Sequence, residues 1–126
     1  MGGLIMTLTL VFRVMAFFVG FWGVGMWLTP GTLAGNWNWD LTHELSVMMQ
    51  FTGTMMIVFG VIHWKMPEWA GDNLKTPGMA FAIFHALLLA LNIFQFFAGN
   101  IPTDLINIAG VVPGAFLTAM FYIKSR

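Results

Sequence analysis

The chain has 126 residues, of which 59% are hydrophobic and only 8% are charged. Soluble domains usually carry about 25% charged residues, so this composition predicts an integral membrane protein. The formal net charge is zero, which argues against a nucleic-acid partner. The chain contains no cysteine, and this excludes disulfides and thiolate metal sites.

Four segments are long and apolar enough to be membrane-spanning helices, which need about 20 mostly apolar residues. The predicted spans are 6–28, 45–64, 79–97 and 105–123. The segments between them are rich in Gly, Pro, Asn or Asp, which favour turns. The sequence therefore predicts an all-α fold, an integral membrane four-helix bundle, with residues 1–126 forming a single transmembrane domain.

Short polar side chains mark the starts of two of these helices. Asp40 or Thr42 is expected to cap the second span, and Thr103 or Asp104 the last one. Side chains of these types accept hydrogen bonds from the first free N–H groups of a helix. The caps therefore indicate that the second helix begins just before residue 45 and the fourth near residue 105.

Charged residues divide unevenly between the two ends of the predicted bundle. If the spans alternate in direction, one end receives the basic residues, with Arg13 closest to it: Lys65, Lys75, Lys124 and Arg126. The opposite end receives only acidic residues: Asp40, Glu44 and Asp104. The positive-inside rule then predicts that both termini and the 65–78 loop are cytoplasmic. We expect a bacterial or archaeal cytoplasmic membrane.

Small residues recur at helical spacing in the spans and predict where helices cross closely, because apolar burial does not drive helix association in lipid. The candidates for helix packing are Gly53, Gly60, Ala82, Ala86, Ala90, Gly110 and Gly114. The third and fourth spans, which a short loop joins, are expected to pack against each other along their alanine and glycine rows. Four amide side chains in the outer half of the membrane are expected to hydrogen-bond between helices: Gln50, Asn92, Gln95 and Asn107. The many phenylalanines and methionines are expected to provide adaptable apolar packing. Those of the third span that lie away from its alanine row are expected to face lipid or a neighbouring subunit, and bound lipids are expected.

Two histidines are the candidate ligands of a cofactor. His63 ends the second predicted span and His85 lies nearly two turns into the third, so their depths differ by about five residues, or about 7 Å. A bis-imidazole haem b needs its two histidines at similar depth. His63, His85 and Arg13 form the candidate haem- or quinone-binding set. The alternative is that His85 hydrogen-bonds another helix, that His63 is interfacial and that Arg13 reaches the lipid headgroups.

The predicted outer end carries a candidate metal site. Asp40, His43 and Glu44 are spaced by three and four residues, which places oxygen and imidazole ligands on one helical face. Acidic residues at helix N-termini are equally explained by the helix dipole. Both interpretations remain open on the sequence.

Two stretches resemble the DoxX-like group of small four-helix bacterial membrane proteins. They are "GFWGVGMWLTPGTL", where the first span ends at a proline, and "ELSVMMQFTGTMMIVFGVIHW", a glycine-bearing second span that opens with Glu44. The resemblance covers about a third of the chain. It implies a four-helix fold and a role such as an auxiliary subunit of a membrane oxidoreductase, and it carries over no catalytic residue.

Catalysis is not expected, because the sequence has no activated nucleophile and no phosphate-binding glycine loop. The leading hypothesis is a non-catalytic accessory subunit of a larger inner-membrane complex, with other transmembrane subunits and lipids as partners. The first alternative is an electron-transfer membrane anchor that binds haem b or quinone. The second is a carrier of lipid or of a small hydrophobic ligand.

Overall fold

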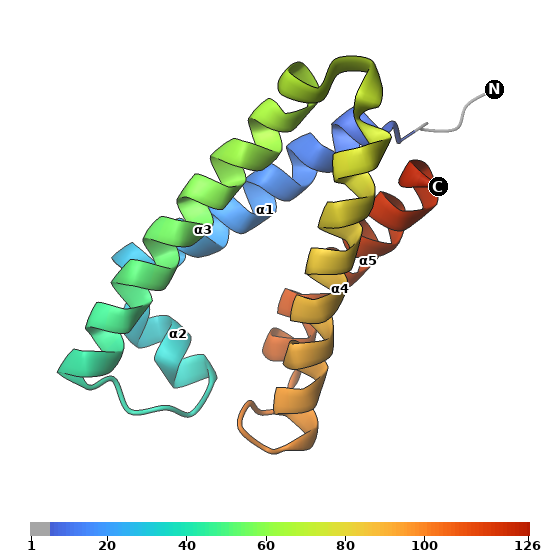
Figure 1. The fold of residues 1–126 in the computed structure, drawn as a ribbon. Coiled ribbons are helices and arrows are strands. Elements are labelled where there is room, and N and C mark those ends of the chain that lie inside the picture. Colours follow the sequence, from blue (N-terminus) through green and yellow to red (C-terminus); the bar gives the residue numbers. More distant parts are fainter. Residues whose placement is uncertain (1–5) are drawn as a thin grey trace.

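The computed structural model describes residues 6–126 as helices joined by short connections (Figure 1). The elements are α1 (Leu8–Leu28), α2 (Pro30–Asn36), α3 (His43–Ala70), the 3-10 turn η1 (Gly71–Asn73), α4 (Lys75–Phe97) and α5 (Leu105–Ser125). No strand is present in the described part of the chain. The all-α prediction is therefore confirmed there, while the first five residues of the predicted domain lie outside the described residues.

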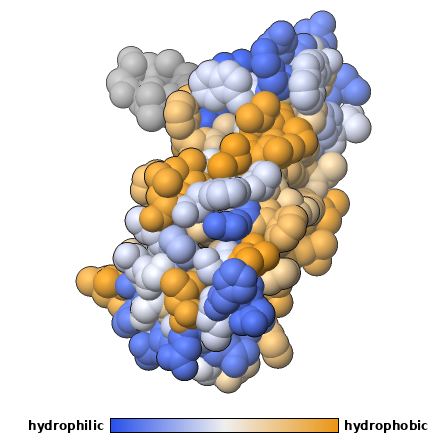
Figure 2. Space-filling model, turned by 90° about the vertical axis from the view of Figure 1, so that its left-hand side faces the viewer, coloured by the Kyte–Doolittle hydropathy of each residue, from blue (hydrophilic) through white to orange (hydrophobic). Residues whose placement is uncertain are grey.

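Four helices in residues 6–126 are long and apolar enough to cross a membrane: α1, α3 with η1, α4 and α5. Orange hydrophobic residues lie along the middle of the face shown in Figure 2, interrupted by a few pale and hydrophilic ones, and hydrophilic residues gather at its two ends. Such a band matches the hydrocarbon core and its polar borders. These helices support an integral membrane protein.

Two connections differ from their sequence predictions. The 65–78 segment was expected to be a loop, but α3 continues through Pro67 to Ala70, and α4 begins at Lys75. Gly71 ends α3 because its φ of 54° is a conformation that suits glycine and few other residues. The connection after α1 contains the short helix α2.

For each of the two predicted helix starts, one of the two candidate residues is the cap. The Thr42 side chain accepts a hydrogen bond from the N–H of Leu45 at 3.1 Å, and α3 starts directly after it. Asp104 Oδ1 accepts from the N–H of Asn107 at 3.0 Å and begins α5. Asp40 and Thr103 are not the capping residues, because each lies one or two positions too early.

The helices form two antiparallel pairs, α1 with α3 and α4 with α5. We call them the first and second hairpin. Helices α1 and α5 contact each other and join the two hairpins, whereas α3 and α4 separate beyond η1 (Figure 1). The bundle is therefore closed on its α1–α5 side and open on its α3–α4 side.

Glycines allow α1 and α3 to cross with their backbones in contact. A Cβ built on Gly23 would lie 2.6 Å from the carbonyl oxygen of Gly53, and one on Gly53 would lie 2.6 Å from that of Gly23. A Cβ on Gly60 would lie 3.0 Å from the carbonyl oxygen of Ala16. The prediction that Gly53 and Gly60 are packing positions is confirmed.

The glycines of α5 pack against α1, whereas the sequence suggested the neighbouring α4. A Cβ on Gly110 would lie 3.2 Å from the Trp22 ring, and one on Gly114 would lie 3.2 Å from the Phe18 ring. Gly110 and Gly114 therefore make room for two large aromatic side chains of α1, and their role as packing positions is confirmed with a different partner.

The alanine row of α4 is only partly a packing row. Ala82 is buried, but Ala86 and Ala90 are exposed in the chain. Residues spaced by four rotate about 40° per step around a helix, so such a row drifts away from a straight contact face. The buried stripe of α4 instead runs through Gly78, Ala82 and His85, and the expectation for Ala86 and Ala90 is corrected.

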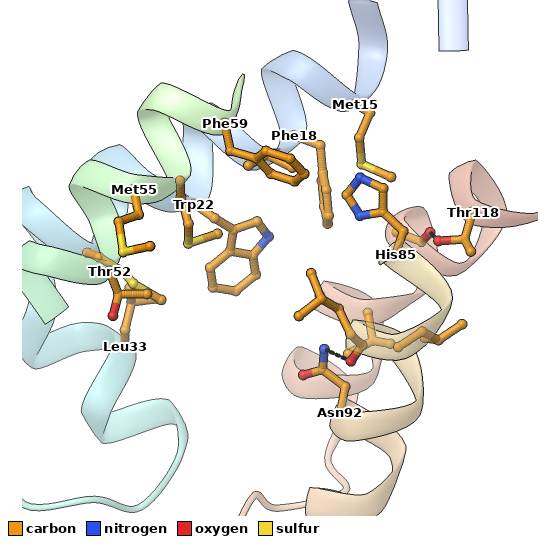
Figure 3. Close-up of a pocket in the computed structure, with 18 of the residues that line it drawn as sticks. Met15, Phe18, Trp22, Leu33, Thr52, Met55, Phe59, His85, Asn92 and Thr118 are labelled. Atoms are coloured by element: carbon orange, nitrogen blue, oxygen red, sulfur yellow. Dashed lines mark hydrogen bonds between the residues drawn. The ribbon is translucent and has the colours of Figure 1, made fainter. Parts of the chain in front are cut away.

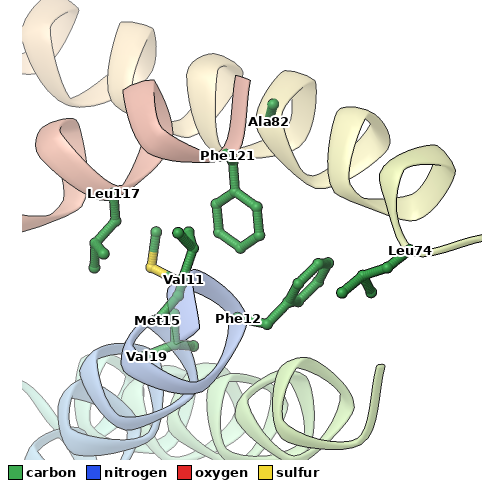
Figure 4. Close-up of a cluster of buried hydrophobic side chains, with 8 residues drawn as sticks. All are labelled: Val11, Phe12, Met15, Val19, Leu74, Ala82, Leu117 and Phe121. Atoms are coloured by element: carbon green, nitrogen blue, oxygen red, sulfur yellow. The ribbon is translucent and has the colours of Figure 1, made fainter. Parts of the chain in front are cut away.

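A buried apolar cluster holds the hairpins together near η1. Its members are Val11, Phe12, Met15, Val19, Leu74, Ala82, Leu117 and Phe121. Figure 4 shows side chains of α1 meeting Leu117 and Phe121 of α5, with Leu74 at one edge. The rings of Phe12 and Phe121 contact edge to face, with centroids 4.8 Å apart, a favoured aromatic geometry.

Two hydrogen bonds join the hairpins at the opposite end, where α2 and the 98–104 loop lie. Asn107 Nδ2 donates to the carbonyl oxygen of Asn36, and Trp39 Nε1 donates to that of Asn100, both at 2.8 Å. The predicted hydrogen bond of Asn107 to another helix is therefore confirmed. These contacts close the far end of the molecule between its two halves.

The other three amides do not bond between helices as expected. Asn92 Nδ2 donates to the carbonyl of Leu88 in its own helix, and Gln95 Oε1 accepts from Asn100 in the adjoining loop. The side-chain amide of Gln50 makes no hydrogen bond within residues 6–126. The hydroxyl of Thr54 donates to the backbone carbonyl of Gln50 and not to its side chain. Divergence of the hairpins explains this correction, because these positions face open space or their own hairpin.

Candidate functional site

A cavity of about 800 Å³ lies between the two hairpins. Its walls come from α1 and α3 on one side and from α4 and α5 on the other, and α2 contributes Leu33 at the far end. Figure 3 shows Phe18, Trp22 and Met55 across the space from Asn92. Most of the lining side chains are apolar, so the cavity suits an apolar molecule.

The cavity opens sideways between α3 and α4. Four of the residues of these helices that line it are also exposed on the surface: Met55 at 72%, Val58 at 54%, Phe84 at 46% and Leu88 at 43%. Its other sides are closed by the α1–α5 contact and by the hydrogen bonds of the far end. For a protein in a bilayer, this opening faces the lipid chains.

His63 and His85 form the polar end of the cavity region. The two Nε2 atoms are 2.8 Å apart, a hydrogen-bond distance, and His63 Nδ1 lies 2.7 Å from the carbonyl oxygen of Phe59. His63 is fully buried and His85 is 6% exposed, with His85 lining the cavity. The expectation that His85 hydrogen-bonds another helix is therefore confirmed, whereas the expectation that His63 is interfacial is wrong.

Aromatic rings surround the histidine pair. The centroid of the His63 ring lies 4.2 Å from that of Phe59 and 4.6 Å from that of Phe81. The His85 ring stacks on Phe121 at 5.7 Å with an interplanar angle of 14°. The rings enclose the hydrogen bond between the two imidazoles, while His85 also borders the cavity.

The predicted depth difference of the histidines is corrected by the helix bounds. His63 lies seven residues before the end of α3 at Ala70, and His85 lies ten residues after the start of α4 at Lys75. The sequence prediction ended the second span at residue 64 and began the third at 79. The longer helices bring the two side chains to similar depth.

A haem held between His63 and His85 does not fit this geometry. Metal–imidazole bonds are about 2.0–2.1 Å long, so two nitrogens on opposite sides of an ion are about 4 Å apart. The observed 2.8 Å is a direct hydrogen bond, and the rings are enclosed by Phe59, Phe81 and Phe121. Arg13 lies elsewhere, with its Cζ 4.2 Å from the centroid of the Trp64 ring. The haem alternative therefore does not fit these residues as they are placed, and the quinone alternative stays a prediction.

The candidate metal site at Asp40, His43 and Glu44 is not assembled. Within residues 6–126, no group of three or more His, Asp or Glu side chains is placed to hold a metal ion. Asp40 precedes the Thr42 cap and is outside α3, so the helical spacing assumed for it does not apply. Glu44 lies in the first turn of α3, where a carboxylate is favoured by the helix dipole.

Sequence reasoning missed the cavity, although it identified His85 and Asn92 among its lining residues. The aromatic wall residues Phe18, Trp22 and Phe59 carry no sequence signal that distinguishes them from lipid-facing aromatics. The four-residue spacing of Phe18 and Trp22, matched by that of Gly110 and Gly114, is the one available clue to the α1–α5 contact.

Comparison with protein-family models, with curated proteins and with solved structures found no match. The fold and the site define a class, an all-helical protein with four helices long and apolar enough to span a membrane and a lateral apolar cavity. The resemblance to the DoxX-like group stays a prediction.

Proposed function

We propose that this protein is a non-catalytic membrane protein that binds an apolar or amphiphilic small molecule of the bilayer. The observation that carries the proposal is the cavity of about 800 Å³ between the hairpins, open sideways between α3 and α4. Ligand sites are typically about 300–1,000 Å³ and are lined mainly by apolar and aromatic side chains with a few polar groups. This is the lipid or hydrophobic-ligand carrier among the alternatives drawn from the sequence.

The polar groups of the cavity support an amphiphilic ligand. His85 lies toward η1, and Asn92 and Asn107 lie toward the far end. Both asparagines line the cavity, and each amide nitrogen donates a hydrogen bond within the protein, that of Asn92 to the carbonyl of Leu88 and that of Asn107 to the carbonyl of Asn36. A long apolar molecule with a small polar group matches such a surface better than a pure hydrocarbon does.

A photoreactive alkyl probe tests this function. We expect a diazirine-bearing alkane in lipid nanodiscs to crosslink to cavity residues such as Met55 and Phe84, in a saturable way. Leu88→Trp, which fills the opening on α4, is expected to lower this crosslinking several-fold, because it occupies the space that the probe needs. Crosslinked peptides are quantified by mass spectrometry.

Leu87→Trp is the matched control. Leu87 neighbours Leu88 on α4 and is 67% exposed, but it does not line the cavity. Its replacement is expected to leave crosslinking at Met55 and Phe84 unchanged. Uniform labelling of all exposed apolar residues, with no effect of Leu88→Trp, would contradict a binding function.

An accessory subunit of an inner-membrane complex is the second candidate. In the described residues, helices occupy nearly the whole chain, so little structure lies outside the membrane segments. The open α3–α4 side offers apolar surface to a helix of another subunit as well as to a lipid. Stoichiometric association with one membrane protein in native mass spectrometry, together with loss of probe crosslinking in that complex, would favour this candidate.

We further propose that both termini and η1 face the cytoplasm of a bacterial or archaeal cell. Lys65, Lys75 and Lys124 lie at the η1 end of the helices, whereas Asp40 and Asp104 lie at the other end. The positive-inside rule supports this orientation.

Single cysteines test the orientation, because the natural chain has none. In intact cells, a membrane-impermeant maleimide is expected to label Thr103→Cys but not Asn73→Cys. After permeabilisation both should react. Both side chains are exposed in loops or turns, so the pattern reports sidedness. The reverse pattern would overturn the proposed orientation.

A further inference from the structure

The hydrogen bonds of the histidine pair fix where its protons lie. The Phe59 carbonyl oxygen only accepts hydrogen bonds, so the 2.7 Å contact requires a proton on His63 Nδ1. In a neutral imidazole the other nitrogen is then an acceptor. His63 Nε2 therefore accepts, and the 2.8 Å contact requires that His85 Nε2 carries a proton and donates it.

The pair is neutral in this arrangement. His63 is fully buried among aromatic rings, and a buried charge without a partner is strongly unfavourable. Within residues 6–126 the carboxylates lie at helix ends or in connections: Asp40, Glu44, Glu68, Asp72 and Asp104. Arg13 lies over the Trp64 ring and makes no hydrogen bond to either histidine. No described charge therefore compensates an imidazolium at this position.

His85 Nδ1 is left as an acceptor beside the cavity. His85 lines the cavity and is 6% exposed, and no group within residues 6–126 donates to its Nδ1. Only Arg13 Nε and Ser125 Oγ are fully buried side-chain nitrogen or oxygen atoms without a partner in that range. His85 Nδ1 is not one of them, so it is still accessible. The nearby Thr118 hydroxyl donates to the carbonyl oxygen of Gly114 at 2.6 Å. The acceptor therefore needs a donor from outside the protein.

The depth of this acceptor limits the ligand. His85 lies ten residues into α4, which corresponds to about 15 Å along the helix axis. A phosphate or another charged headgroup at this depth would lose its hydration without a compensating charge. A neutral hydroxyl group brings no charge to desolvate, and the bond that it donates to Nδ1 replaces the one that it donated to water.

We propose that the cavity selects a bilayer molecule that carries a neutral hydroxyl group, a long-chain or isoprenoid alcohol, and that this hydroxyl donates to His85 Nδ1. The inference rests on the proposed function and adds the chemical class of the ligand. The Phe59 carbonyl and His63 act as positioning groups, since they set the tautomer of His85. A carbonyl group, which only accepts, finds no donor at this atom.

Competition against the alkyl photoprobe in nanodiscs tests the ligand class. We expect 1-hexadecanol to displace the probe at about three- to tenfold lower concentration than its methyl ether, which matches one interhelical-type hydrogen bond in a membrane. The methyl ether and 2-hexadecanone should compete equally with each other. Equal competition by all three would overturn the hydroxyl selectivity and leave the cavity function standing, whereas no competition by any would contradict the cavity function itself. Preference for the ketone would overturn the assigned tautomer.

Nitrogen-15 NMR supplies a readout that does not depend on the photoprobe. In His43→Gln, which removes the exposed third histidine, two imidazoles remain. We expect one ring protonated at Nδ1 and one at Nε2, both neutral, with the Nδ1 signal of His85 shifting when 1-hexadecanol is added. Two rings of the same tautomer, or a shift with the methyl ether as well, would overturn the proposal.

Discussion

Gly23→Ala is expected to destabilise the protein by about 1–3 kcal/mol, the usual cost of overpacking a close contact. The new methyl group would lie 2.6 Å from the carbonyl oxygen of Gly53 and 2.9 Å from Cγ1 of Ile57. The first of these atoms belongs to the backbone, so α1 and α3 must move apart along their whole crossing. The apparent free energy of unfolding in mixed detergent micelles measures the loss.

Gly20→Ala is the matched control on the same helix. A Cβ at Gly20 meets nothing within 4 Å. Alanine is favoured over glycine inside a helix by about 0.5–1 kcal/mol, so this variant should be as stable as the natural protein or slightly more stable. Equal destabilisation by Gly20→Ala and Gly23→Ala would show that helix crossing is not the cause.

The second large effect concerns the histidine pair. His63→Leu is expected to destabilise the protein by about 1–3 kcal/mol, because it leaves the buried N–H of His85 without an acceptor. The double variant His63→Leu/His85→Leu should recover part of this loss, since replacing both partners by apolar groups removes the unpaired donor. Unfolding free energies of the four members of this mutant cycle give the coupling of the two side chains.

His43→Gln serves as the control for histidine loss as such. His43 is exposed at the first turn of α3, and surface substitutions of this kind usually change stability by less than about 0.5 kcal/mol. A double variant less stable than both single variants would contradict a direct bond between His63 and His85.

The spans were predictable from sequence because hydrocarbon thickness and composition determine them. Helix ends were predictable where a side chain caps the backbone, as at Thr42 and Asp104. The end of α3 was not, because its last turns, which include Lys65 and Glu68, are polar yet helical. Hydropathy marks where lipid ends, and a helix does not stop there.

The histidine pair illustrates the same limit for the site. The sequence identified His63 and His85 but placed them about 7 Å apart in depth, because it used the hydrophobic ends of the spans as the helix ends. The cavity could not be predicted from the sequence for another reason. It depends on the divergence of α3 and α4, whereas the hairpins meet through α1 and α5, where Gly110 and Gly114 make room for Trp22 and Phe18.

The sideways opening between α3 and α4 decides which concentration of a ligand sets the occupancy of the cavity. A molecule that reaches the cavity through this opening never leaves the membrane phase, so its free concentration in water does not set the extent of filling. The governing quantity is its mole fraction among the lipids. Two samples with the same amounts of protein and ligand but different amounts of lipid would therefore differ in how far the cavity is filled. The sample with less lipid has the higher mole fraction of ligand and the higher occupancy.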